Sequence, residues 1–479
     1  MPTMNRVDEN TLHVPRQGAM VTDAWIFARE TIQLERGAVD QLCDAASIDP
    51  DAQVFATPDI HIGYGVPIGC VWATPHYISP AAVGYDINCG MRLMTTPLDA
   101  ADVDVRALAD SIRRDIPLGE GKASQELPPR DMKQFLARGV PAVEMLCRHN
   151  PRFRRAFRPD ELAADLLRIE DGGCMAADPG CVPDQAMARG RVQFGTLGGG
   201  NHFIELQRVD RVFDTALADA WGLREGQFVV MIHSGSRGLG HEVGGQFMKR
   251  ALKFNERRGD TLPNRQLMYL PLESAEGREY FEAMKCAANF AYANRQVMAT
   301  LVRHDVRHAL GEIAMPLVYD VAHNIAKFEE AGGRRLCVHR KGATRAFPAS
   351  KMAGTPFAAT GQPVLIPGSM GTASYLLSGV ESGRRSLWSV NHGAGRVMSR
   401  TEAAGKVTRK GKVLRPGAVS DDEFREAMAG VYLVCEDRHH IKEEAPQAYK
   451  DIEAVIDTVV GAGLAGRVAR MVPLAVLKG

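Results

Sequence analysis

The sequence lacks an excess of charge of either sign and any long apolar run. Its 58 lysines and arginines nearly cancel its 57 aspartates and glutamates, which leaves a net charge of +1. Contact with nucleic acid would therefore have to come from a local basic patch. No segment approaches the ~18 uninterrupted apolar residues of a membrane helix, and the first residues lack the apolar core of a signal peptide. We expect a cytoplasmic protein that does not enter a membrane.

Cysteines are few and follow no pattern. The nine cysteines run from Cys43 to Cys435 without a CxxC pair or the spacing of a disulfide-rich secreted domain. An odd number without such spacing is typical of reduced thiols in a cytoplasm-like compartment, where an individual cysteine can be buried or can bind a metal.

The composition is that of a globular protein, with 45% hydrophobic and 24% charged residues. Strand-like runs alternate with helical segments, which predicts an α+β fold with a mixed sheet core and surrounding helices. Residues 1–50 indicate an irregular arm followed by a short helix near 37–48, and residues 51–479 indicate one large domain. Helices are predicted over 274–310 and, from a capping box of Ser420 and Glu423, to about residue 433. Strand-like runs are found at 227–233, 316–323, 336–339, 363–367 and 386–392.

Histidines stand at the ends of four of these strand-like runs, namely His233, His323, His339 and His392, and a fifth, His202, lies in GTLGGGNHFIEL. A single histidine in such a place is usually a hydrogen-bonded polar residue. Several histidines beside small or glycine-rich turns are harder to explain by packing, because glycine lets a ligand approach the backbone. Imidazoles are the commonest metal ligands at neutral pH, so the pattern predicts a shared metal or catalytic centre.

The segment VGYDINCGMR adds Asp86 and Cys89, three residues apart. A carboxylate and a thiolate at this spacing can face one ion, and the thiolate favours metals such as manganese, cobalt or zinc over magnesium. The alternative is a turn-capping aspartate beside a buried cysteine. Two neighbouring ions are a common device for handling phosphates.

Three glycine-rich turns, at 195–200, 235–240 and 367–371, resemble the backbone nests that bind anions. None matches GxxxxGK[ST], which disfavours a P-loop NTPase. Basic residues in or near these and neighbouring loops are candidates for contact with phosphate oxygens, although solvated surface is the alternative for each: Arg237, Arg340, Lys341, Arg345 and Arg396.

Nine motifs in order, from His61 to Ile456, resemble the RtcB family of RNA-splicing ligases: HIGYGVPIGCV, VGYDINCGMR, GGGNHFIEL, MIHSGSRGLGHE, DVAHN, VHRKGATR, PGSMGTASY, HGAGR and AYKDIEAVI. The resemblance implies a single catalytic domain that uses two manganese ions and GTP. It also implies the sealing of RNA 3′-phosphate or 2′,3′-cyclic phosphate ends to 5′-hydroxyl ends, in RNA repair or tRNA splicing.

The resemblance also implies roles for individual residues. Manganese ligands fall at Asp86, Cys89, His202, His233 and His323, and the guanylylated nucleophile falls at His392. Guanylate-binding positions fall at Asn201, His202, Phe203, Ile204, Glu205, His323, Asn324, Pro367, Gly368, Ser369, Met370, Ser374, His392, Gly393, Ala394, Gly395 and Lys450. Lys450 would donate to the guanine O6 or N7, and Glu205 would accept from the N1–H and amino group.

The RNA substrate and a need for an archease-type activator stay open at this point. The arm before residue 50 and the arginine-rich segment 148–158 are the parts that match the family's motifs least. A metal-dependent phosphoesterase acting on RNA ends is the alternative enzyme, but it needs neither a histidine nucleophile nor a nucleotide pocket. A non-enzymatic RNA-binding module would show a basic stripe with stacking aromatics, whereas aromatics are only 6% here.

Overall fold

Two large sheets and a layer of helices make up the computed structural model, which describes residues 2–407, 413–436 and 440–479. The first sheet has the order β1-β2-β3-β4-β5-β13-β12. Its strands are β1 (Asn5–Asp8), β2 (Thr11–Val14), β3 (Ala24–Phe27), β4 (Gln53–His61), β5 (Ile68–Thr74), β12 (Asn324–Ala331) and β13 (Arg334–Lys341).

The second sheet has the order β11-β7-β9-β8-β21-β16-β15, and β20 pairs with β21 off this path. Its strands are β7 (Gly90–Asp99), β8 (Phe203–Val212), β9 (Gln227–Ser234), β11 (Leu317–Ala322), β15 (Pro363–Ile366), β16 (Ser374–Gly379), β20 (Tyr432–Cys435) and β21 (Ala465–Lys478). Three two-stranded sheets complete the set: β6 (Tyr77–Ile78) with β10 (Leu270–Pro271), β14 (Ala343–Arg345) with β17 (Ser389–Asn391), and β18 (Gly405–Val407) with β19 (Val413–Pro416).

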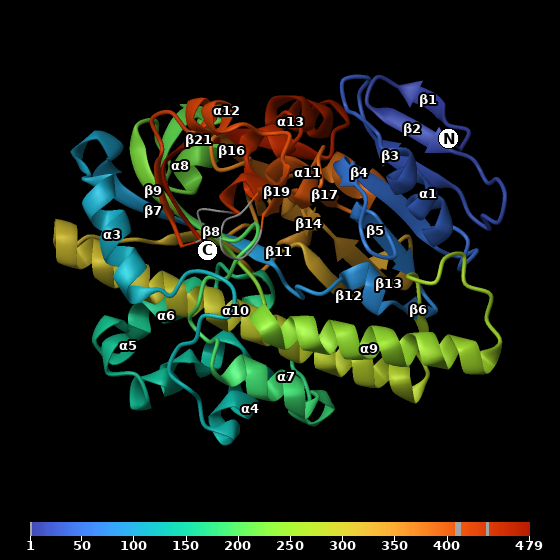
Figure 1. The fold of residues 1–479 in the computed structure, drawn as a ribbon, viewed down its shortest axis with the longest axis horizontal. Helices are drawn as coiled ribbons and strands as arrows, with labels where there is room; N and C mark the ends of the chain where they lie inside the picture. Colours follow the sequence, from blue (N-terminus) through green and yellow to red (C-terminus); the bar gives the residue numbers. More distant parts are fainter. Residues whose placement is uncertain (1, 408–412, 437–439) are drawn as a thin grey trace.

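The α-helices are α1 (Arg36–Ala45), α2 (Pro80–Val83), α3 (Val105–Asp115), α4 (Pro129–Arg138), α5 (Pro151–Ala156), α6 (Pro159–Leu166), α7 (Asp184–Arg191), α8 (Thr215–Ala220), α9 (Arg237–Arg258), α10 (Ala275–Leu310), α11 (Arg400–Ala404), α12 (Asp421–Ala427) and α13 (Ile452–Gly461). Figure 1 shows α9 and α10 lying together along one side of the sheets, with α4, α5 and α7 beyond them. No helix among the described residues is long and apolar enough to span a bilayer.

The predicted mixed α+β fold is confirmed, and each predicted strand-like run contains a strand. The helix predicted over 274–310 is α10, which begins where the Ser274 hydroxyl accepts a hydrogen bond from the Gly277 amide at 2.9 Å. Small side chains such as Ala287, Ala288 and Ala291 let its middle part be buried on all sides.

Two expectations differ from the structure. Residues 5–27 form β1, β2 and β3 rather than an irregular arm, and β3 pairs in parallel with β4. The domain division at residue 50 stays a prediction, although the sheet crosses it. The helix that begins at the Ser420 capping box ends at Ala427, not near 433, because Gly430 takes a φ of +84° and the chain then forms β20 beside β21.

Candidate functional site

Four strand ends of the second sheet bring the predicted metal ligands together. The strands β11, β7, β9 and β8 are neighbours in that order. Cys89 precedes β7, His202 precedes β8, and His323 follows β11. His233 lies near the end of β9 and pairs with Phe203 on one side and Met91 on the other. Side chains far apart in the sequence therefore meet where these four neighbouring strands end.

The ligand atoms are close enough to share ions. Cys89 Sγ lies 3.4 Å from His202 Nε2 and 3.1 Å from His233 Nε2. His233 Nε2 is 3.2 Å from His323 Nε2, and Asp86 Oδ2 is 2.8 Å from His202 Nε2. Cys89 thus belongs to two groups, one with Asp86 and His202 and one with His233 and His323.

Backbone carbonyls fix the orientation of two of these imidazoles. The Nδ1–H of His202 donates to Leu197 O at 3.0 Å, and that of His233 donates to Asn201 O at 3.0 Å. Each ring therefore turns its Nε2 toward the Cys89 sulfur, and the His202 Nε2 also faces the Asp86 carboxylate. A hydrogen bond from the far ring nitrogen to a backbone carbonyl is the usual support of a metal-binding histidine.

The electrostatics of the cluster also fit a cation. Burial raises the pKa of the Cys89 thiol well above its usual range, and the Asp86 carboxylate adds to this effect. Burial lowers the pKa values of His233 and His323 well below the usual value, so both rings are neutral at pH 7. The sulfur therefore needs a bound cation in order to act as a thiolate at neutral pH.

His392 follows β17 and is held by a buried carboxylate. Its Nδ1–H donates to Asp59 Oδ2 at 2.6 Å, and its backbone amide donates to the same oxygen at 3.2 Å. Burial alone would raise the pKa of Asp59, but hydrogen bonds from His392 and Thr57 hold it below the usual value. Because Nδ1 carries the proton, the His392 Nε2 keeps a free lone pair. Gly395 makes this turn possible, since a Cβ there would lie 2.3 Å from Asp59 O.

A cavity opens beside His392 and contains most of the predicted guanylate-binding positions. The predicted residues that line it are Asn201, Phe203, His233, His323, Asn324, Pro367, Gly368, Ser369, Met370, His392, Gly393, Ala394 and Gly395. The predicted residues that do not line it are Asp86, Cys89, His202, Ile204, Glu205, Ser374 and Lys450. Of these, Glu205 and Ser374 are held together by the amide of Gln207, which donates to the Glu205 carboxylate at 2.6 Å and to the Ser374 hydroxyl at 3.1 Å.

Lys450 and Lys478 differ in their relation to the cavity. The Lys450 ammonium is buried and donates to Pro58 O at 3.1 Å and Ile60 O at 2.6 Å, away from the cavity lining. Lys478 lines the cavity and pairs with Phe203 across β21 and β8, so it lies on the same face as Glu205. Its ammonium donates to Gly200 O at 2.5 Å and to His202 O at 3.5 Å. Glu205 and Glu444 both oppose the fall that burial causes in the pKa of Lys478.

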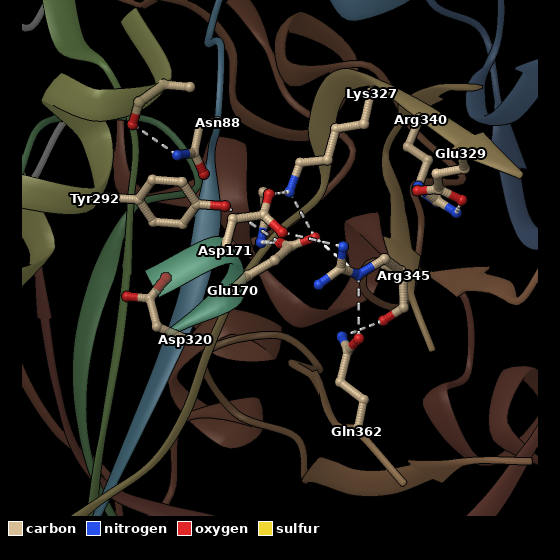
Figure 2. Close-up of polar contacts among 12 residues, drawn as sticks. Asn88, Glu170, Asp171, Tyr292, Asp320, Lys327, Glu329, Arg340, Arg345 and Gln362 are labelled. Carbon is tan, nitrogen blue, oxygen red and sulfur yellow. Dashed lines mark hydrogen bonds and ion pairs between the residues drawn. The ribbon is translucent and has the colours of Figure 1, made fainter. Parts of the chain in front are cut away.

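Most of the basic loop residues predicted to contact phosphate already have partners within the protein. Figure 2 shows Arg340 paired with Glu329 at 2.5 Å and Arg345 reaching Glu170 at 3.1 Å. Lys341 donates to Ala81 O at 2.9 Å. Of the five candidates, Arg396 lines the cavity.

Several residues of this region were not predicted as site residues, among them Asp59, His61 and Lys478. Asp59 orients His392, Lys478 lines the cavity, and His61 lines it with its Nδ1–H donating to Asp59 O at 2.8 Å. Burial lowers the pKa of His61 to about 4, so this ring is neutral at pH 7. The available signal was that His61 opens the HIGYG motif and Asp59 lies two residues before it. For Lys478 the sequence offers no signal beyond a lysine at the end of a strand-like run.

Comparison with known proteins gives a consistent result. The family model described as tRNA-splicing ligase RtcB matches residues 41–479. The tRNA-splicing ligase RtcB of Archaeoglobus fulgidus is 41% identical over 97% of this chain and 96% of its own length. The protein of the same name from Thermococcus kodakarensis is 44% identical over 88% of this chain and 86% of its own. The RNA-splicing ligase RtcB of Mycobacterium tuberculosis is 42% identical over 89% of this chain and 96% of its own length.

Proposed function

Because the chain belongs to the RtcB family of RNA ligases, we propose that it joins RNA 3′-phosphate or 2′,3′-cyclic phosphate ends to 5′-hydroxyl ends with GTP as the activating nucleotide. Such an activity would serve tRNA splicing or RNA repair. All nine cysteines are free thiols, which is in keeping with a cytoplasmic location. The observation that carries the proposal is the pairing of His392 with Asp59 beside two groups of side chains that can hold metal ions.

His392 is the proposed nucleophile. Its Nε2 lone pair attacks the α-phosphorus of GTP, an N–P bond forms, and the bond to the β-phosphate oxygen breaks to release pyrophosphate. The Asp59 carboxylate holds the Nδ1 proton and offsets the positive charge that develops on the ring. A 3′-phosphate oxygen of the RNA then attacks the same phosphorus, so the N–P bond breaks and the RNA end carries the guanylate.

The 5′-hydroxyl completes the reaction. Its oxygen attacks the RNA 3′-phosphorus, a phosphodiester forms, the hydroxyl proton is lost, and GMP leaves. A 2′,3′-cyclic phosphate end would first be opened by water to a 3′-phosphate. This order of steps needs one nucleophile that can carry a nucleotide, which a simple phosphoesterase does not need.

We propose that the metal is manganese, as two ions. Asp86, Cys89 and His202 would hold one ion, and Cys89, His233 and His323 the other. When bound, the ions supply positive charge that offsets the charge on phosphate oxygens and lowers the pKa of bound water. Asp86 suits this role because its carboxyl is ionised at neutral pH. Burial alone would raise its pKa, but His202 and Arg237 hold the pKa below its usual value.

For the nucleotide, we propose that Glu205 and Lys478 read the guanine base. A lysine ammonium can donate to O6 or N7, and a carboxylate can accept from N1–H and the amino group, a pattern that adenine does not offer. The predicted contact of Lys450 with guanylate stays a prediction, but its ammonium already donates to two carbonyls.

The proposal is tested by ligation of an RNA with a 3′-phosphate to one with a 5′-hydroxyl, with each nucleotide and metal supplied separately. We expect product with GTP and manganese, and none with ATP or after chelation. Release of free phosphate without joining would instead support the phosphoesterase alternative.

A further inference from the structure

Exposed arginines gather where α5 lies against the end of α3. The surface consists of Arg148, Arg152, Arg154 and Arg155 of the 140–156 segment together with Arg114 from the last turn of α3, and all five side chains are exposed. We refer to these five residues as the α5 basic surface. Figure 1 shows α5 on the same side of the molecule as α3 and the end of α10.

Contacts and electrostatics make this a single cluster. Arg152 donates to Arg114 O at 3.4 Å and forms an ion pair with Asp115. His304 of α10 lies close to these charges: burial lowers its pKa most, Arg307 and His308 lower it further, and Arg152 and Arg155 add smaller effects of the same sign. The residues therefore share one region of positive potential.

Charge on this surface is largely uncompensated. None of Arg148, Arg154 and Arg155 has an ion-pair partner among the residues that the structure describes. The exposed arginines near α9 and the start of α10 are different, because Arg257 pairs with Glu276 at 3.4 Å and Arg278 with Glu273 at 3.9 Å. Paired arginines leave little net field, whereas unpaired ones attract an anionic partner within about one Debye length, roughly 8 Å at physiological salt.

The α5 basic surface is connected to the candidate site. Arg113, next to Arg114, donates to Glu436 at 3.0 Å, and Lys122 lies 3.4 Å from the same carboxylate. Lys122 and Glu436 line a second cavity, to which Arg400 and Lys478 also belong. Both Arg400 and Lys478 line the cavity beside His392. The side chains between the reaction site and α3 are thus of both signs, since Glu436 pairs with Arg113 and Lys122, and the unpaired arginines begin at α5.

We propose that the α5 basic surface binds backbone phosphates of the RNA substrate at a distance from the two ends that are joined. The proposal rests on the proposed RNA ligase function and extends it to the body of the substrate. Guanidinium groups suit phosphate oxygens, and unpaired exposed arginines release counterions from RNA without first having to break an ion pair. The surface would favour structured RNA over short single strands that reach only the cavity.

The test uses the double variant Arg154→Gln/Arg155→Gln, with Arg257→Gln/Arg278→Gln as the control that removes the same charge from the paired surface. Binding of a hairpin RNA bearing a 3′-phosphate and a 5′-hydroxyl is measured over a range of salt concentrations. We expect the slope of log K against log salt to fall by about 1 for each arginine lost from the α5 basic surface. The control variant should keep the wild-type slope.

Ligation kinetics separate this surface from the reaction site. The Arg154→Gln/Arg155→Gln variant should raise KM for the hairpin several-fold, leave kcat unchanged, and ligate short single-stranded RNAs as the wild type does. A wild-type salt slope of hairpin binding in this variant overturns the proposal, and that is the result expected if the surface binds an acidic protein instead of RNA. An equal loss of ligation on short single-stranded RNA and on the hairpin also overturns it. If the wild type ligates nothing, the proposed function fails, whereas the salt slope still tests the surface.

Discussion

Two groups of polar side chains lie near the same strand ends and differ in how their charges are balanced. In the first, the predicted metal-ligand cluster of Asp86, Cys89, His202, His233 and His323, Asp86 pairs with His202, but the described residues give Cys89, His233 and His323 no ion-pair partner. In the second, the ion-pair cluster of Glu170, Asp171, Lys327 and Arg345, two carboxylates meet two cations.

Each charged group of the ion-pair cluster has an oppositely charged partner within the cluster. Lys327 Nζ lies 2.7 Å from Glu170 and 2.5 Å from Asp171, and Glu170 also accepts the Ala322 amide at 2.8 Å (Figure 2). Because Ala322 precedes His323, this cluster supports the strand end that carries a predicted ligand. Satisfied charges indicate a structural role, and unsatisfied lone pairs indicate a binding site.

Removal of the shared ligand should have the largest effect on activity. Cys89→Ala takes one ligand from both predicted ion sites, so ligation should fall by more than the roughly 10–100-fold that loss of a supporting residue costs. Stability of the metal-free protein should change little. The measurements are manganese binding by calorimetry and ligation rate. Unaltered manganese binding would show that Cys89 is merely buried.

Asp59→Asn should slow guanylylation by roughly 10²–10⁴-fold, because a neutral amide cannot offset the charge on the ring and can turn its NH2 group toward Nδ1, which would move the His392 proton to Nε2. Single-turnover labelling with GTP measures this step. Manganese affinity serves as the control and should match the wild type. A full labelling rate in the variant would contradict the orienting role of Asp59.

Glu170→Gln should act on stability rather than on chemistry. Loss of one partner from a buried ion pair costs about 3–5 kcal/mol, and Lys327 and Arg345 would lose part of their compensation. The midpoint of urea unfolding should move to a lower urea concentration, while the rate of labelling by GTP per folded molecule stays near wild type. If stability is retained and labelling is lost, the two clusters do not have the separate roles assigned to them.

Lys478→Met should reduce the preference for GTP over ATP by roughly 1–3 kcal/mol, about tenfold to a hundredfold, because one donor to guanine is lost. Lys450→Met is the matched comparison and should leave that ratio unchanged, since Lys450 does not line the cavity. The self-labelling ratio with the two nucleotides decides between the lysines. The opposite result would restore the role predicted for Lys450.

The smallest effect concerns pH. Burial raises the pKa of Glu205 to about 8, so the free protein holds this carboxyl protonated at pH 6 and 7. If guanine binds the carboxylate form, binding releases a proton, and GTP affinity rises by up to tenfold per pH unit until about pH 8 and then levels off. Glu205→Gln should abolish the slope. A wild-type affinity that is flat between pH 6 and 8 would exclude this role.

The five residues that the family resemblance implies as metal ligands do lie together, and their role as ligands stays a prediction. The local pattern of a histidine beside a glycine-rich turn at a strand end is not sufficient, because His339 shares it and its ring contacts Trp72 O and the Ser79 amide instead.

The sequence could not predict that Arg345 is internally paired, since Asp171 lies 174 residues from it and only the fold brings them together. The partner of Arg340, Glu329, lies 11 residues away and meets it through the pairing of β12 with β13. Residues 5–8 were not recognised as a strand because all four are exposed and no alternation marks them. Lys478 was missed because a lysine at a strand end is ordinarily solvated.

The most direct test of the central claim is to find the nucleotide on the protein. The wild type is incubated with GTP and manganese, denatured, digested and analysed by mass spectrometry, with His392→Ala treated in parallel. We predict one acid-labile guanylate on the peptide that contains His392, and none in the variant, whose fold and manganese binding are intact. Guanylate on another residue, or its persistence in His392→Ala, would contradict the assignment of His392 as the nucleophile.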